Sequence, residues 1–281
     1  MMPNVFVYGT LRKGERNHHF LDGATCIFEQ CRTNGSLYDT NNGYPAMKEN
    51  KSDWIYGELY EVTESQLKAI DSLEGFEEGY WDNLYNRTTV PVYNDSGEEI
   101  RAIIYTAGQA LHKFTKRIPS GDWLVYNYLK QDEILYFAYG SCMDDERFKL
   151  AGADQYFANL KGRGILNGFE FKFSRSTHDG GKADLVENSK EKVEGKVYKI
   201  PHEAMEYLYK REGVYVNAYR PAIVPVTINR LIYHAITFIG MEKSAEMKPT
   251  ELYATEIIRG GCGLLSYEYL QRIQQKIDRF N

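Results

Sequence analysis

Two glutamates at matching positions are the residues of this sequence best suited to acid–base chemistry. Glu74 and Glu212 each directly precede a glycine at the predicted end of a helix, and Gly57 and Gly195 stand the same 17 residues before them. A carboxylate at a helix C-terminus faces the negative end of the helix dipole, so both positions are electrostatically disfavoured. A local preference broken twice at one place is typical of a functional site. The dipole and any burial should raise the carboxyl pKa toward that of a general base. The alternative is an ordinary solvated glutamate beside a helix-ending glycine.

A Tyr-Gly-(Thr/Ser) loop follows a predicted buried strand in each half of the sequence. Apolar, β-prone runs that stop at such a loop are typical of strands that lead into a tight turn. The glycine lets the backbone turn and lets a ligand approach main-chain N–H groups. The first loop is Tyr8, Gly9, Thr10 and Leu11, and the second is Tyr139, Gly140, Ser141 and Cys142.

Each glutamate is positioned by a predicted strand followed by a short helix. Gly57–Val62 alternates as a strand, and Thr63 with Gln66 forms a capping box that starts the first helix. Gly195–Ile200 is the matching strand, and it leads to the helix Glu203–Arg211. The other predicted elements are strands at Asn86–Tyr93, Ile100–Thr106, Gly164–Ser174, Ala183–Glu187, Arg220–Ile228 and Tyr233–Ile239, and helices at Thr250–Ile258 and Ser266–Ile277.

The order of loop, strand, helix and Glu-Gly occurs twice, which indicates a tandem duplication of a domain-sized unit. With 281 residues, the chain is long enough for two domains that each bury a core. We predict one domain over residues 1–130 and a second over residues 133–281.

The composition limits the classes of partner. The formal charge is −5 and no basic block occurs, so we expect neither nucleic acid nor an anionic membrane as a partner. No apolar run approaches the roughly 20 residues of a membrane-spanning helix, and the start of the sequence lacks the pattern of a secretion signal. Four cysteines form no CxxC and no zinc-like spacing with the six histidines. We therefore expect a cytoplasmic protein with reduced thiols and no metal.

The motifs of both halves resemble one superfamily. The first half is similar to the γ-glutamylamine cyclotransferase branch of the γ-glutamylcyclotransferase-like superfamily, and the second half to γ-glutamylcyclotransferase proper. The similarity covers most of the chain. In the first half it lies in Val5–Gly14, Asn17-His18, Tyr60–Val62, Leu73-Glu74 and Arg87-Thr88; in the second it lies in Tyr136–Ser141, Gly195–Tyr198, Glu212–Val214, Tyr219 and Leu264–Ile277.

This resemblance implies an α+β fold of two tandem domains, each a small mixed β-barrel flanked by helices, without cofactor or metal. It implies a lyase or acyltransferase that releases 5-oxoproline from a small-molecule γ-glutamyl substrate. The substrate's own α-amine attacks its γ-carbonyl carbon, so the reaction depends on positioning. The two loops would bind the γ-glutamyl moiety, and Glu74 and Glu212 would move protons. Neither the group attached to the γ-glutamyl moiety nor the oligomeric state follows from the sequence.

One residue departs from the family pattern. The second loop has Cys142 where γ-glutamylcyclotransferase has asparagine, and a thiol is a weak substitute for an amide. We therefore expect altered specificity or reduced activity at the second site. An alternative function is a non-catalytic or half-catalytic module that binds γ-glutamyl-like small carboxylates. A rival interpretation makes Cys142 a nucleophile activated by His178 or His202, although no basic cluster is evident beside it.

Overall fold

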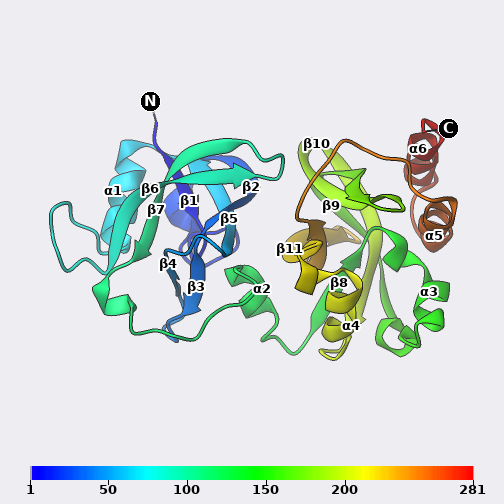
Figure 1. Ribbon diagram of the computed structural model, residues 1–281, viewed down its shortest axis with the longest axis horizontal. Helices are drawn as coiled ribbons and strands as arrows, with labels where there is room; N and C mark the ends of the chain where they lie inside the picture. The colour runs from blue at the N-terminus through cyan, green and yellow to red at the C-terminus, as the bar shows by residue number, and fades with distance from the viewer. Residues whose placement is uncertain (1, 281) are drawn as a thin grey trace. The chain divides into compact units, whose positions relative to one another are not determined.

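A computed structural model describes residues 2–280 of the chain (Figure 1). Contacts between residues divide it after Tyr126 into two compact units. Each unit contains one closed five-stranded barrel of mixed strand direction with flanking helices. The predicted α+β fold of two tandem barrel domains is confirmed. No helix within residues 2–280 is long and apolar enough to cross a membrane.

The barrel of the first unit has the strand order β1-β5-β2-β6-β7. Strand β1 pairs antiparallel with β5, and it closes the barrel by pairing parallel with β7 at Val5 and Ile103. A separate two-stranded sheet consists of β3 and β4. The strands are β1 (Asn4–Val7), β2 (Thr25–Asn34), β3 (Ser36–Asp39), β4 (Pro45–Lys48), β5 (Trp54–Glu61), β6 (Tyr85–Asn94) and β7 (Glu99–Ala107).

The barrel of the second unit has the order β10-β8-β12-β11-β9 and closes where β12 pairs parallel with β8 at Ile236 and Tyr136. The predicted strands Ala183–Glu187 and Gly195–Ile200 are parts of one long strand, β10. Its pairing with β9 continues beyond the polar segment between them after a register shift between Glu187 and Lys192. The strands are β8 (Ile134–Ala138), β9 (Asn159–Thr177), β10 (Gly180–Ile200), β11 (Tyr219–Ile228) and β12 (Leu231–Gly240).

The helices that precede the two glutamates end as predicted. Thr63 caps α1 through the predicted capping box, in which its side chain accepts from the Gln66 N–H and its own N–H donates to Gln66 Oε1 at 2.9 Å. The helix α4 starts one residue later than predicted, because Glu203 is its N-cap. The α-helices are α1 (Glu64–Leu73), α2 (Trp123–Tyr128), α3 (Asp145–Leu150), α4 (Ala204–Arg211), α5 (Glu251–Gly261) and α6 (Tyr267–Asp278), with short 3₁₀ turns η1 (His18–Leu21), η2 (Gln109–Leu111), η3 (Ser141–Met143), η4 (Asp154–Phe157) and η5 (Val214–Val216).

The core of the first unit fixes the end of α1 beside the end of β1. Side chains of a strand alternate between its two faces, so Val5 and Val7 enter one buried cluster and Phe6 enters another. Leu67 and Ile70 of α1 belong to the same cluster as Val5 and Val7. The helix therefore packs against β1, and the residues that follow the two elements reach one place.

Candidate active site

The first predicted loop and Glu74 line one cavity of about 200 Å³. The structure brings together all five residues that the sequence singled out in the first domain. Arg16, Asn17 and Tyr85 also line the cavity, as do Phe6, Val7, Tyr44, Pro45, Leu73, Leu84 and Tyr105. Asn17 lies in one of the motifs that carry the family resemblance. No local pattern singled out Tyr85 or Tyr105, because these residues lie on elements that only the folded barrel brings together.

The loop after β1 is held by hydrogen bonds on both sides. The Tyr8 hydroxyl donates to the carbonyl of Tyr105 at 2.6 Å, which ties the loop to β7. The Asn17 N–H donates to the Thr10 carbonyl, and Asn17 Nδ2 donates to Thr10 Oγ1, each at 3.0 Å. A Cβ atom on Gly9 would stand 2.9 Å from Pro45 Cγ, so only glycine fits there.

Three main-chain donors of this loop remain available. No hydrogen bond within residues 2–280 engages the N–H groups of Gly9, Thr10 or Leu11. Successive N–H groups in a turn form a concave site for an anion or a polarised carbonyl oxygen. The loop can therefore hold a carboxylate or stabilise a developing oxyanion in the cavity.

Glu74 is the acid–base candidate of this cavity. It is the C-cap residue of α1, it is half-buried, and the following Gly75 adopts the left-handed conformation with φ of 61°. Burial raises the pKa of Glu74 to about 7. No hydrogen bond or ion pair engages its carboxylate within the part of the chain that the structure describes. A carboxyl group with a pKa near 7 can accept and return a proton at neutral pH.

The second loop and Glu212 are also brought together, but around a cavity of only about 30 Å³. That volume has room for one or two water molecules. The arrangement repeats the first: the Tyr139 hydroxyl donates to the Phe238 carbonyl at 2.6 Å, and Glu212 is the C-cap residue of α4. Tyr219 and Tyr253 complete the wall.

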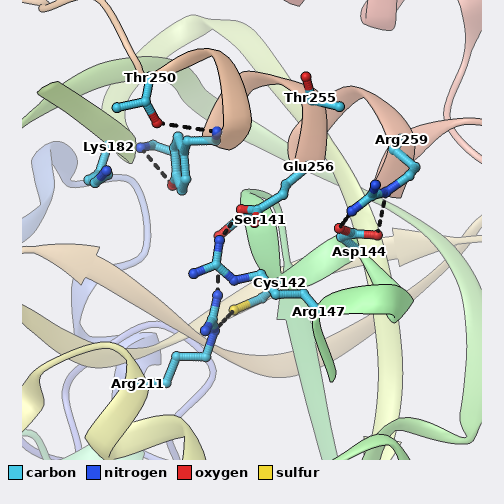
Figure 2. Close-up of polar contacts among 12 residues, drawn as sticks. Ser141, Cys142, Asp144, Arg147, Lys182, Arg211, Thr250, Thr255, Glu256 and Arg259 are labelled. Atoms are coloured by element: carbon cyan, nitrogen blue, oxygen red, sulfur yellow. Dashed lines mark hydrogen bonds and ion pairs between the residues drawn. The ribbon is translucent and has the colours of Figure 1, made fainter. Parts of the chain in front are cut away.

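Neighbouring side chains occupy the second site. The Cys142 thiol donates to Glu212 Oε1 at 3.1 Å, and Arg211 Nε donates to Cys142 Sγ at 3.0 Å (Figure 2 shows the contact with Arg211). Arg211 Nη2 also donates to Ser141 Oγ at 3.4 Å. Burial raises the pKa of Glu212, although the Cys142 hydrogen bond and the charges of Arg211 and Arg147 oppose the shift. This carboxylate already has partners, unlike that of Glu74.

No basic cluster beside Cys142 is evident in the sequence, but the structure places an arginine against its sulfur. Arg211 immediately precedes Glu212 at the end of α4 and contacts the sulfur. The nearest partners of the thiol are therefore an arginine and a glutamate, whereas His202 Nε2 is bonded to the Gln131 carbonyl at 3.0 Å. Burial raises the pKa of Cys142 to about 11, so the neutral thiol predominates near pH 7. This environment does not favour a nucleophilic cysteine.

Helix α5 forms ion pairs with the chain that follows the second loop. Glu256 forms an ion pair with Arg147, and Arg259 Nε donates to Asp144 Oδ1 at 3.1 Å (Figure 2). From the same helix, the Tyr253 hydroxyl accepts from the Ala183 N–H at 3.1 Å. These contacts stabilise the narrow form of the second cavity. Across residues 2–280, no three His, Cys, Asp or Glu side chains gather as a metal site would require.

Each of the two tandem barrels has a Tyr-Gly loop and a half-buried glutamate that line one cavity, which defines a duplicated small-molecule site. Two family models match parts of the two domains. The model described as "Gamma-glutamyl cyclotransferase, AIG2-like" matches residues 5–125, and the model described as "AIG2-like family" matches residues 192–273. The chain belongs to the γ-glutamylcyclotransferase family, with two of its domains in tandem.

YkqA of Bacillus subtilis is similar over almost the whole chain. It is 41% identical over 279 residues, which are 98% of this chain and 97% of that protein. Its crystal structure matches with a TM-score of 0.87 at 39% identity and covers 99% of this chain and 98% of the other. The resemblance inferred from the motifs is therefore confirmed.

Two shorter relatives match about a third of the chain. Gamma-L-glutamyl-butirosin B gamma-glutamyl cyclotransferase of Niallia circulans is 49% identical over 97 residues, 34% of this chain and 61% of that protein. Gamma-glutamylaminecyclotransferase A of Danio rerio is 32% identical over 114 residues, 37% of this chain and 68% of that protein.

Proposed function

We propose that the first domain releases 5-oxoproline from γ-glutamyl amines, peptides or amino acids, and that Glu74 is its proton acceptor and donor. The observation that carries this proposal is an unpartnered carboxyl group of pKa about 7, which lines the same cavity as the Tyr8–Leu11 loop. The family membership and the names of the two shorter relatives support the same reaction class.

The proposed reaction is an intramolecular ring closure. Glu74 takes a proton from the substrate's α-ammonium group, and the freed amine nitrogen attacks the γ-carbonyl carbon. The N–H groups of Gly9, Thr10 and Leu11 hold the substrate and stabilise the developing oxyanion. The bond between the γ-carbon and the departing nitrogen then breaks. Glu74 returns its proton to that nitrogen and then transfers to it the second proton that the ring nitrogen gives up. The products are 5-oxoproline and the protonated amine, and Glu74 is a carboxylate again.

For the second domain, we propose a role without comparable turnover. Its glutamate is bonded to Cys142, and its cavity is about 30 Å³. A γ-glutamyl group does not fit in this volume unless lining residues such as Cys142 or Tyr253 move. This domain is therefore a binding or structural module, which is the half-catalytic alternative.

A matched pair of variants of the full chain tests both proposals. Glu74→Gln preserves shape and removes the base, so 5-oxoproline release from γ-glutamyl peptides should fall about 10²–10⁴-fold. Glu212→Gln is the matched control and should leave release within about twofold of the wild-type rate, since the first site supplies the turnover. Release that survives Glu74→Gln within a few-fold refutes the role of Glu74, and a large loss in Glu212→Gln refutes the inactive second site.

A further inference from the structure

Among residues 2–280, Arg16 is the one positively charged residue that lines the cavity of the first domain, and Glu74 is the one acidic residue. Its side chain is exposed. Among residues 2–280, no carboxylate lies within ion-pairing distance of its guanidinium. A guanidinium carries five N–H donors in a planar fork that matches a carboxylate. An uncommitted guanidinium beside a small-molecule cavity can therefore bind an anionic group of the ligand.

Two loops place Arg16 at this position. The turn that contains it is tied to the Tyr8–Leu11 loop, because the next residue, Asn17, donates to the Thr10 carbonyl. The guanidinium lies over Gly43 in the turn between β3 and β4, where a Cβ atom would stand 3.2 Å from Arg16 Nη1. Gly43 also has a φ of 79°, which favours glycine. The Arg16 side chain therefore extends from the turn beside the Tyr8–Leu11 loop to the turn between β3 and β4, next to the cavity.

The direction of the substrate follows from the proposed function, on which this inference rests. The γ-glutamyl moiety has to reach Glu74 and the free N–H groups of the Tyr8–Leu11 loop, which are half-buried or buried. The departing group is then the part that extends toward the exposed Arg16. We propose that Arg16 binds a carboxylate on the departing group, so the preferred substrates are γ-glutamyl amino acids or peptides with a free carboxylate next to the scissile bond.

The second domain offers a contrast. Arg211, which contacts the lining residues Cys142 and Ser141 of the second cavity, is committed to the protein itself. Arg16 has no such tether. The difference assigns a ligand-binding role to Arg16 and a structural one to Arg211.

Two substrates that differ in one group test the inference with the full chain. γ-Glutamyl-alanine has a carboxylate on its departing group, and γ-glutamyl-alaninamide has a neutral amide in its place. Arg16→Gln should lower kcat/KM for γ-glutamyl-alanine about tenfold, mainly through KM, because a charge-assisted hydrogen bond is lost at an exposed position. The same variant should change kcat/KM for γ-glutamyl-alaninamide by less than about twofold. Arg101→Gln removes an exposed arginine of β7 outside the cavity and should change neither.

The outcomes separate the inference from the proposed function. If wild-type protein releases 5-oxoproline from neither compound, the proposed function fails and the inference with it. If both compounds are substrates and Arg16→Gln lowers neither, the inference alone is overturned. An equal loss for both compounds also overturns it, because Arg16 would then contact the shared γ-glutamyl moiety.

Discussion

The burial of the Glu74 carboxyl group comes at the expense of folding stability. Burial raises its pKa from 4.5 to about 7. The Glu74 carboxylate therefore binds a proton more tightly in the folded protein than in the unfolded chain. A raised acid pKa destabilises the fold wherever the carboxylate is charged in both states. The cost is therefore complete above pH 7 and disappears as the pH falls through the window toward 4.5.

Glu74→Gln should consequently stabilise the first domain at pH 8 and have little effect at pH 5. A shift of this size corresponds to roughly 3 kcal/mol, and partial exposure reduces it to about 1–3 kcal/mol. All three tryptophans lie in the first domain, at positions 54, 81 and 123, so their fluorescence during urea unfolding reports on this domain alone. The prediction fails if the variant and the wild type have equal stability at pH 8, or if the gain is larger at pH 5.

At the scale of elements, matching positions of β5 and β10 form ion pairs with residues that follow the two Tyr-Gly loops, but the β-strand residues have opposite charges. In the first unit, Arg12, which follows the loop, pairs with Glu58 of β5 at 3.1 Å. In the second, Asp145 at the start of α3 pairs at 3.1 Å with Lys196 of β10, which occupies the repeat position of Glu58. The strand position is therefore charged in both units, but its partners come from different places in the two chain segments.

Breaking the two ion pairs should lower the free energy of unfolding by different amounts, because their side chains differ in exposure. The side chains of Arg12 and its partners Glu58 and Asp122 are 4%, 4% and 1% exposed, whereas that of Asp145 is 61% exposed. Removing one member of a fully buried pair leaves uncompensated charge in the interior, which costs about 3–5 kcal/mol. In the second pair only the Lys196 side chain is buried, at 8% exposed, and its ammonium group faces a carboxylate that water reaches, so the loss of this pair should cost less.

Arg12→Ala should therefore lower the free energy of unfolding of the first domain by about 3–5 kcal/mol. Tryptophan fluorescence in urea measures that transition. Asp145→Ala is the control in the second domain, and circular dichroism should show a loss of about 1 kcal/mol or less. A loss for Arg12→Ala no larger than that for Asp145→Ala would contradict the argument.

The sequence predicted the features that depend on local signals. The capping box of α1 and the helix ends at Glu74 and Glu212 are set by residues a few positions apart, and they were found. Strand β2 was missed, since register shifts beside Phe28 disturb its alternation. The link between Arg12 and Asp122 spans 110 positions, so no local pattern reveals it. The contact of Arg211 with Cys142 was missed for the same reason, although Arg211 adjoins a residue already under consideration.

At the scale of the whole molecule, duplication has produced two copies of one framework with unequal cavities. The Tyr-Gly loop, the C-cap glutamate and the tyrosine hydroxyl bonded to the neighbouring strand are present in both. The copies differ in what surrounds the glutamate. The first carboxylate is unpartnered beside about 200 Å³ of space, and the second is bonded to Cys142 beside about 30 Å³.

One pair of equivalent glycines can therefore show which copy binds a ligand. A Cβ atom on Gly9 would stand 2.9 Å from Pro45 Cγ, and one on Gly140 would stand 3.1 Å from Ala183 Cβ, so alanine is similarly crowded at both positions. Pro45 is held by the hydrogen bond from the Tyr85 hydroxyl to its carbonyl at 2.6 Å, and the loop rather than the proline has to move. Gly9→Ala should lower 5-oxoproline release by about tenfold, and Gly140→Ala should leave it within about twofold, since displacing the loop donors weakens catalysis only where a substrate binds.

Calorimetric titration of the full chain with 5-oxoproline should give one binding equivalent for the wild type and for Gly140→Ala, and no resolved binding for Gly9→Ala. Two equivalents in the wild type, one of them lost in Gly140→Ala, would show that the second cavity opens for ligand despite Arg211 and Cys142.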